Sequence, residues 1–139
     1  MPDAPCSEEA PSDVTEPRIG AGPWWLGLGA TSLFAAVMTL IVYSEGLPAP
    51  FTAVPHFDKA LHFGISGMLS FFLDGVLRRR MVRVAGIAVP LAAVLFLVPT
   101  AIEEFLQRYS IHRTSSLGDF AADVAGVACF LWLSRRIGR

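Results

Sequence analysis

The chain has 139 residues, of which 53% are hydrophobic, and a mean hydropathy of +0.53, which excludes an ordinary soluble protein and leaves room for one membrane domain. The formal net charge of -1 is unevenly spread, because residues 1–22 hold five acids and one base while the rest holds ten bases and seven acids. The bases form no stripe outside the helix ends, so nucleic acid is not an expected partner. Two cysteines are too few for a disulfide framework.

Residues 1–22 are acidic and rich in proline, and they contain few side chains that could build a core. We expect this tail to be disordered and to lie in the cytoplasm. Residues 24–43 follow as 20 uncharged residues, enough to cross a bilayer as a helix. The acidic flank does not fit the positive start of a secretory signal, so this helix is expected to stay in the mature protein.

Three more hydrophobic helices are expected, at about residues 58–77, 84–106 and 119–133. The third contains Pro90 and Pro99, which should bend it because proline lacks the backbone N–H of a helical hydrogen bond. The predicted fold is therefore all-α: an integral membrane four-helix bundle over residues 23–139, preceded by the disordered tail.

Arginine placement predicts the orientation of the four helices. Arginines lie after the second helix, at positions 78, 79, 80 and 83, and after the fourth, at 135, 136 and 139. Positive residues favour the cytoplasmic side, so both termini should be cytoplasmic in a multi-pass inner-membrane protein. This topology brings a set of polar residues together at the outer side, and we take them as the candidate site: Asp58, Lys59, His62, Glu104, Gln107, Arg113, Asp119 and Asp123.

Charged groups in a bilayer cost about 2.5–3.5 kcal/mol each, so they normally face the protein interior and form pairs. The plainest interpretation of the candidate site is a structural clasp in which Lys59 meets an acid across the bundle and Arg113 meets Glu104 or Asp123. At the other end, Asp74 is expected to pair with Arg78, one helical turn later.

A metal or nucleophilic site is a weaker interpretation. His62 and the acids Asp58, Glu104, Asp119 and Asp123 are suitable ligand types. However, no close ligand spacing such as HExxH is present, so we expect no metal and no cofactor. No GxSxG motif accompanies the serines near His112, and catalytic residues stay unassigned.

Three positions of the last helix, two small residues and one cysteine, have simpler interpretations. Ala122 and Gly126 form a small-xxx-small pair beside Asp123, which predicts a close contact with another helix. Cys129 lies in an apolar run and is expected to be buried.

Two sequence blocks hold most of the candidate residues. DKALHF at residues 58–63 has the pattern D-K-x-x-H-F, and residues 103–126 have E-x-x-Q, then an arginine, then D-x-x-x-[ND]-x-x-G. These blocks resemble the VanZ-like family of small membrane proteins, named for a teicoplanin-resistance determinant. The matching positions of the second block are Glu104, Gln107, Arg113, Asp119, Asp123 and Gly126. The resemblance covers about residues 30–135 and implies a four-helix membrane domain with a role in the cell envelope.

The chain departs from the family pattern at Ile111, His112 and Ser66, where members often have proline, glycine and tyrosine. The turn geometry beside Arg113 and any role of a tyrosine hydroxyl are therefore not carried over.

Three functions remain open at this point. The leading hypothesis is that the outward-facing cluster binds or senses an envelope glycolipid or its headgroup, with Lys59 and Arg113 meeting phosphate. The second is a membrane hydrolase or transferase acting on lipid-linked phosphates, in which His62 is the acid or base and Asp119 or Glu104 orients water or a metal. The third is a structural membrane subunit in which the cluster is only a clasp.

Overall fold

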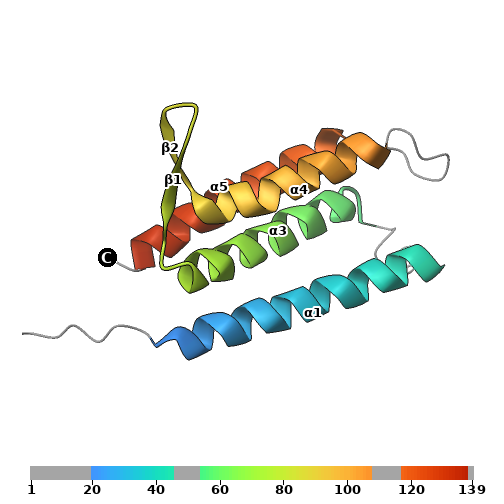
Figure 1. Cartoon of the computed structure of the whole chain (residues 1–139). Coiled ribbons are helices and arrows are strands. Elements are labelled where there is room, and N and C mark those ends of the chain that lie inside the picture. The colour runs from blue at the N-terminus through green and yellow to red at the C-terminus, as the bar shows by residue number, and fades with distance from the viewer. Residues whose placement is uncertain (1–19, 46–53, 108–116, 138–139) are drawn as a thin grey trace, which may run out of the picture.

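The computed structural model describes residues 20–45, 54–107 and 117–137. In these residues it has four helices and one β-hairpin, so the all-α class is confirmed apart from the hairpin. The elements are α1 (Ala21–Glu45), α3 (Phe57–Val76), β1 (Met81–Val84), β2 (Ile87–Pro90), α4 (Leu91–Gln107) and α5 (Leu117–Ile137). Figure 1 shows the helices side by side, with α1 on one side of α3 and α4 and α5 on the other.

Three of the four expected helices lie close to their predicted positions. Residues 1–19 of the expected disordered tail are outside the described residues, and α1 begins at Ala21, so the last part of that tail is already helical. Two helical segments are long and apolar enough to cross a membrane, Ala21–Val42 in α1 and Leu117–Ile137, which is α5.

The expected start of the third helix at residue 84 is wrong. Residues 81–90 form an antiparallel hairpin instead, in which Met81 pairs with Pro90 and Val84 pairs with Ile87. The turn residues Ala85 and Gly86 have φ of 50° and 84°. Positive φ at both residues is required in the two-residue hairpin turn whose twist matches that of the flanking strands. Pro90 would have interrupted a helix from residue 84, and it instead stands directly before the first helical residue, Leu91.

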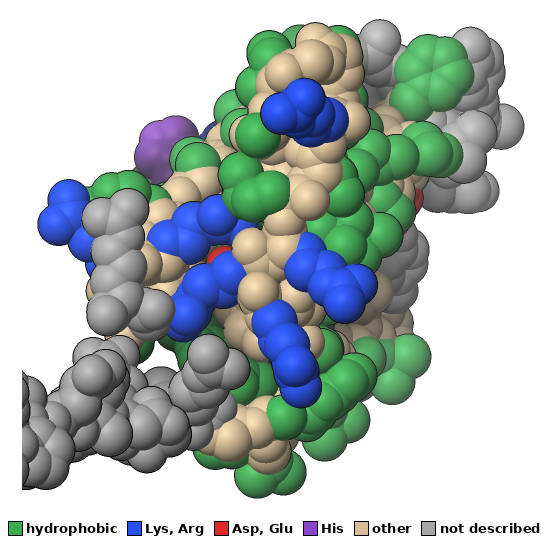
Figure 2. Space-filling model, turned by 60° about the vertical axis from the view of Figure 1, so that its left-hand side comes forward, with side chains coloured by type: hydrophobic (Ala, Val, Ile, Leu, Met, Phe, Trp, Pro, Cys, Tyr) green, Lys and Arg blue, Asp and Glu red, His purple; other side chains and the backbone are tan. Residues whose placement is uncertain are grey.

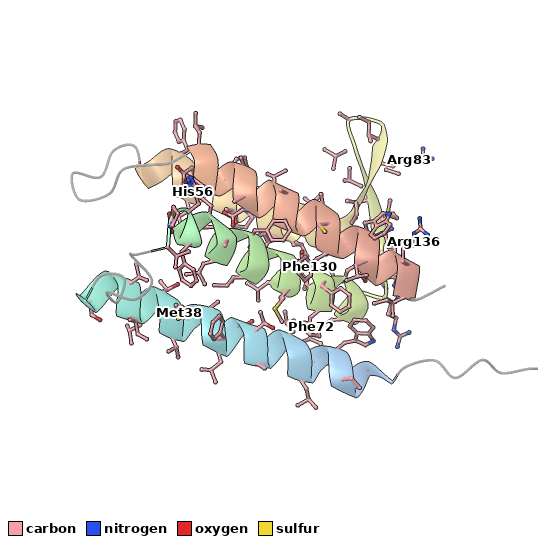
Figure 3. The ribbon with its side chains drawn as sticks, turned by 180° about the vertical axis from the view of Figure 1, so that it is seen from behind. Met38, His56, Phe72, Arg83, Phe130 and Arg136 are labelled. Atoms are coloured by element: carbon pink, nitrogen blue, oxygen red, sulfur yellow. The ribbon has the colours of Figure 1, made fainter. Side chains whose placement is uncertain are left out.

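The closest packing in the fold is between α3 and α5. A Cβ on Gly126 would collide with the backbone carbonyl of Phe63, and one on Gly67 would collide with the ring of Phe130. Figure 3 shows Phe130 directed from α5 toward α3. The predicted close helix contact at Gly126 is confirmed, because only glycine lets the two backbones approach this far.

Among the described residues, many of the most buried side chains are polar, whereas many large apolar side chains are exposed. The buried hydrophobic residues are Ala92, Val127 and Leu131, whereas the buried polar residues include Ser66, Ser70, Asp74, Asp123 and Ser134. In contrast, large apolar side chains cover the outer surface of α1, where Leu26 is 76% exposed. Helix α1 is anchored on α3 by Trp24, which lies against Gly75 and packs beside Phe71.

Two expectations about side chains are corrected. Asp74 does not pair with Arg78; it accepts hydrogen bonds from Ser134 at 3.0 Å and from Arg135 at 3.1 Å, both on α5. The reason is that α3 ends at Val76 and Arg78 has a left-handed φ of 52°, so Arg78 does not continue the helical face of Asp74. Cys129 is exposed on α5 rather than buried.

Candidate functional site

The two ends of the bundle differ in charge: arginines gather at one end, and a mixed set of acidic and basic residues lies at the other. Figure 2 brings the end with the hairpin forward and shows basic side chains gathered there, which are arginines because the only lysine of the chain is Lys59. Figure 3 places Arg83 and Arg136 at that end and His56 at the opposite end. The end near His56 is formed by the start of α3, the end of α4 and the start of α5. It holds five of the residues predicted for the site, which we call the polar cluster: Asp58, Lys59, His62, Asp119 and Asp123.

Lys59 forms the first link between α3 and α5. Its Nζ donates to Asp119 Oδ1 at 2.8 Å, so the predicted pairing of this lysine with an acid across the bundle is confirmed. Asp58 and Asp119 stand in the first turns of α3 and α5, where a carboxylate is stabilised by the positive end of the helix dipole. The Lys59 side chain remains 41% exposed, so it is fixed in place but accessible.

His62 forms the second link. Its Nδ1 lies 3.2 Å and 3.3 Å from the two carboxylate oxygens of Asp123, which is only 9% exposed. An ionised carboxylate can only accept, so Nδ1 carries the hydrogen and donates it. The other ring nitrogen, Nε2, lies 3.9 Å from Asp58 Oδ1, one turn earlier on the same helix. The imidazole is thus held between a buried carboxylate and an exposed one.

Ser66 supports this arrangement, and sequence reasoning treated it only as a departure from a family pattern. Its hydroxyl donates to the backbone carbonyl of His62, and the carbonyl oxygen of Asp123 lies 3.4 Å away. Its position one turn after His62, on the same helical face, is the signal that identifies it. A small hydroxyl fits here because Gly126 packs against the same turn of α3.

The rest of the predicted site is only partly described. Glu104 on α4 has a buried Oε1 without a hydrogen-bond partner among the described residues. The side chain of Gln107 and the whole of Arg113 lie outside the described residues. The predicted contact of Arg113 with Glu104 or Asp123 therefore stays a prediction, while Asp123 is already engaged by His62.

The polar cluster also gathers metal-ligand atoms. One such atom from each of Asp58, His62 and Asp119 lies within 4.8 Å of the others. The expectation of no metal site was based on the absence of a close spacing along the chain. That criterion does not apply to these residues, because they come from the first two turns of α3 and the first turn of α5, about 60 residues apart.

Comparisons with protein-family models, with curated proteins and with solved structures gave no match for this chain. The VanZ-like resemblance of the two sequence blocks therefore stays a prediction.

Proposed function

We propose that this protein is a multi-pass membrane protein whose polar cluster binds the headgroup of an envelope lipid. Helices α1 and α5 are long and apolar enough to cross a membrane, and α3, with 20 residues, is about 30 Å long, which matches the hydrocarbon core. The combination of a polar interior with an apolar outer surface supports the proposal. In a membrane, exposed leucines such as Leu26 would contact lipid chains instead of water.

The unequal charge at the two ends supports one orientation. Arginines at the hairpin and at the end of α5 favour the cytoplasmic side for that end. The polar cluster then faces outward, and the exposed apolar residues of the hairpin, Met81, Val84 and Ile87, lie at the inner interface beside Arg83.

The observation that carries the headgroup proposal is that Lys59 is held by Asp119 and is still accessible. Asp119 uses one of its three N–H donors, and the remaining donors can bind a phosphate oxygen. Asp58, whose side chain is 55% exposed, can accept hydrogen bonds from sugar hydroxyls. A headgroup that combines a phosphate with a sugar fits both features, as in a phosphoglycolipid.

The test uses the full chain in nanodiscs of neutral lipid that contain increasing fractions of a phosphoglycolipid. We expect Lys59→Gln to weaken binding by about tenfold, the loss of one charge-assisted hydrogen bond of about 1.5 kcal/mol. The matched control is Arg83→Gln, which removes an exposed base from the other end and should leave binding unchanged. Equal effects of the two variants would show that the lipid responds to overall charge, and the proposal would be abandoned.

The structural clasp is a second candidate, favoured by the fact that Lys59–Asp119 and His62–Asp123 both join α3 to α5. A pure clasp predicts that the double variant Lys59→Asp/Asp119→Lys restores both stability and any lipid binding lost in Lys59→Asp. The headgroup proposal predicts that stability returns while lipid binding does not, because the lysine then extends from α5 instead of α3. The membrane hydrolase or transferase stays a prediction, to be tested by turnover of lipid-linked phosphates.

A further inference from the structure

We propose that Asp58, His62 and Asp119 form a binding site for a divalent transition metal, with Zn²⁺ as the best fit. Each residue offers one ligand atom, and the three atoms lie within 4.8 Å of one another near the starts of α3 and α5. One imidazole and two carboxylates are a donor set that zinc accepts, whereas Mg²⁺ and Ca²⁺ prefer sites made of oxygen alone. This site does not depend on the lipid headgroup proposal.

The orientation of His62 is the strongest support for the site. Histidines that bind metals usually donate their second ring N–H to a carboxylate or carbonyl, which fixes the ring and makes the ligating nitrogen more basic. His62 has this arrangement, because Nδ1 is held by both oxygens of the buried Asp123. The opposite nitrogen, Nε2, is directed toward Asp58 Oδ1. Asp123 is therefore a positioning residue, and the metal would bind on the other side of the ring.

The distances are compatible with binding after small side-chain movements. Zinc bonds of about 2.0–2.2 Å in a tetrahedron separate neighbouring ligand atoms by roughly 3.3 Å. The present separation of 3.9 Å between His62 Nε2 and Asp58 Oδ1 is slightly larger, and Asp58 is exposed enough to rotate inward. Asp58 and His62 are four residues apart on one helix, so their side chains already share a face. Three protein ligands leave a coordination position for solvent or for an oxygen of a bound molecule.

Lys59 provides a second, independent test of the site, through its effect on zinc affinity. Its ammonium lies 2.8 Å from Asp119 Oδ1, which leaves the second carboxylate oxygen for the metal. A neighbouring positive charge opposes the binding of a cation. Removing that charge should therefore strengthen zinc binding, although the same change should weaken lipid binding.

Zinc binding is measured by calorimetry on the full chain in detergent after the metal has been stripped with a chelator. The chain has three histidines, so the double variant His56→Asn/His112→Asn leaves His62 alone and should bind one Zn²⁺ per chain as the wild type does. In this background, His62→Gln should abolish specific binding. Asp123→Asn should weaken it by about 10–100-fold, as loss of an outer carboxylate does elsewhere, and Lys59→Gln should tighten it.

A second measurement leaves Asp58, His62 and Asp119 unchanged, so it does not depend on whether variants of these residues fold. Pulsed electron paramagnetic resonance of the double variant loaded with Cu²⁺ should show coupling to one imidazole nitrogen. Absence of that coupling, or unchanged zinc affinity in a folded His62→Gln variant, would overturn the metal site. Absence of zinc binding together with phosphoglycolipid binding would refute the metal site and support the headgroup proposal. Zinc binding without phosphoglycolipid binding would refute the headgroup proposal and support the metal site.

Discussion

Replacement of Gly126 by alanine tests the contact that sets the distance between α3 and α5. A methyl group at this position would collide with the carbonyl oxygen of Phe63 and would lie 3.0 Å from the carbonyl carbon and from Ser66 Oγ. The carbonyl belongs to a helix backbone and cannot rotate away, so the two helices must separate. Such separation would also lengthen the Lys59–Asp119 and His62–Asp123 contacts.

The expected change in the stability of Gly126→Ala follows from two opposing effects. Forcing a methyl into a closely packed contact destabilises by about 1–3 kcal/mol, and replacing glycine by alanine inside a helix returns about 0.5–1 kcal/mol. Gly64 provides the matched control, because it lies in α3 and a Cβ there meets nothing within 4 Å. Gly64→Ala should therefore gain the helical benefit alone, and Gly126→Ala should be less stable than Gly64→Ala by about 1–3 kcal/mol.

The assay is equilibrium unfolding in mixed micelles, followed by circular dichroism, with both variants compared with the wild type. If Gly126→Ala were as stable as Gly64→Ala, the close approach of the two helices at this turn would be wrong. The position of the polar cluster between them would then lose its support.

Two further predictions concern the other end and the orientation of the bundle. Asp74→Ala should destabilise by about 3–5 kcal/mol in the same assay, since it removes the partner of Ser134 and Arg135 at a fully buried position; a loss no greater than that of Asp58→Ala would contradict the contact. In a chain with both native cysteines replaced by serine, His56→Cys should react with an impermeant thiol reagent added outside, whereas Ile87→Cys should react only after permeabilisation. The reversed labelling pattern would overturn the proposed orientation.

Much of the fold and of the site could be predicted from composition and spacing. Long uncharged runs located the helices, since spanning length is a property of one segment at a time. The four-residue spacings of Asp58 with His62 and of Asp119 with Asp123 placed each pair on one face. Topology then brought both faces to one end, and Lys59 was correctly expected to meet an acid across the bundle.

Partner choice was harder to predict, because it depends on how the helices are rotated against each other. Asp74 has Arg78 nearby in sequence, yet its partner is Arg135, 61 residues away, since the helix of Asp74 stops before Arg78. The hairpin was missed because residues 84–90 are uncharged and were counted as part of a span. Gly86 and Pro90 were the signals for it, one by allowing a positive φ and the other by ending the strand before a helix.

The link between Lys59 and Asp119 can form only after synthesis has passed residue 119. The two residues are 60 positions apart, so at about 5–20 residues per second the ribosome needs roughly 3–12 s to make the second after the first. Until α5 emerges, Lys59 and His62 have none of the α5 carboxylates that hold them in the finished protein. A chain that stops before α5 therefore has Lys59 without Asp119 and His62 with Asp58 alone, which distinguishes incomplete chains from complete ones by their chemistry.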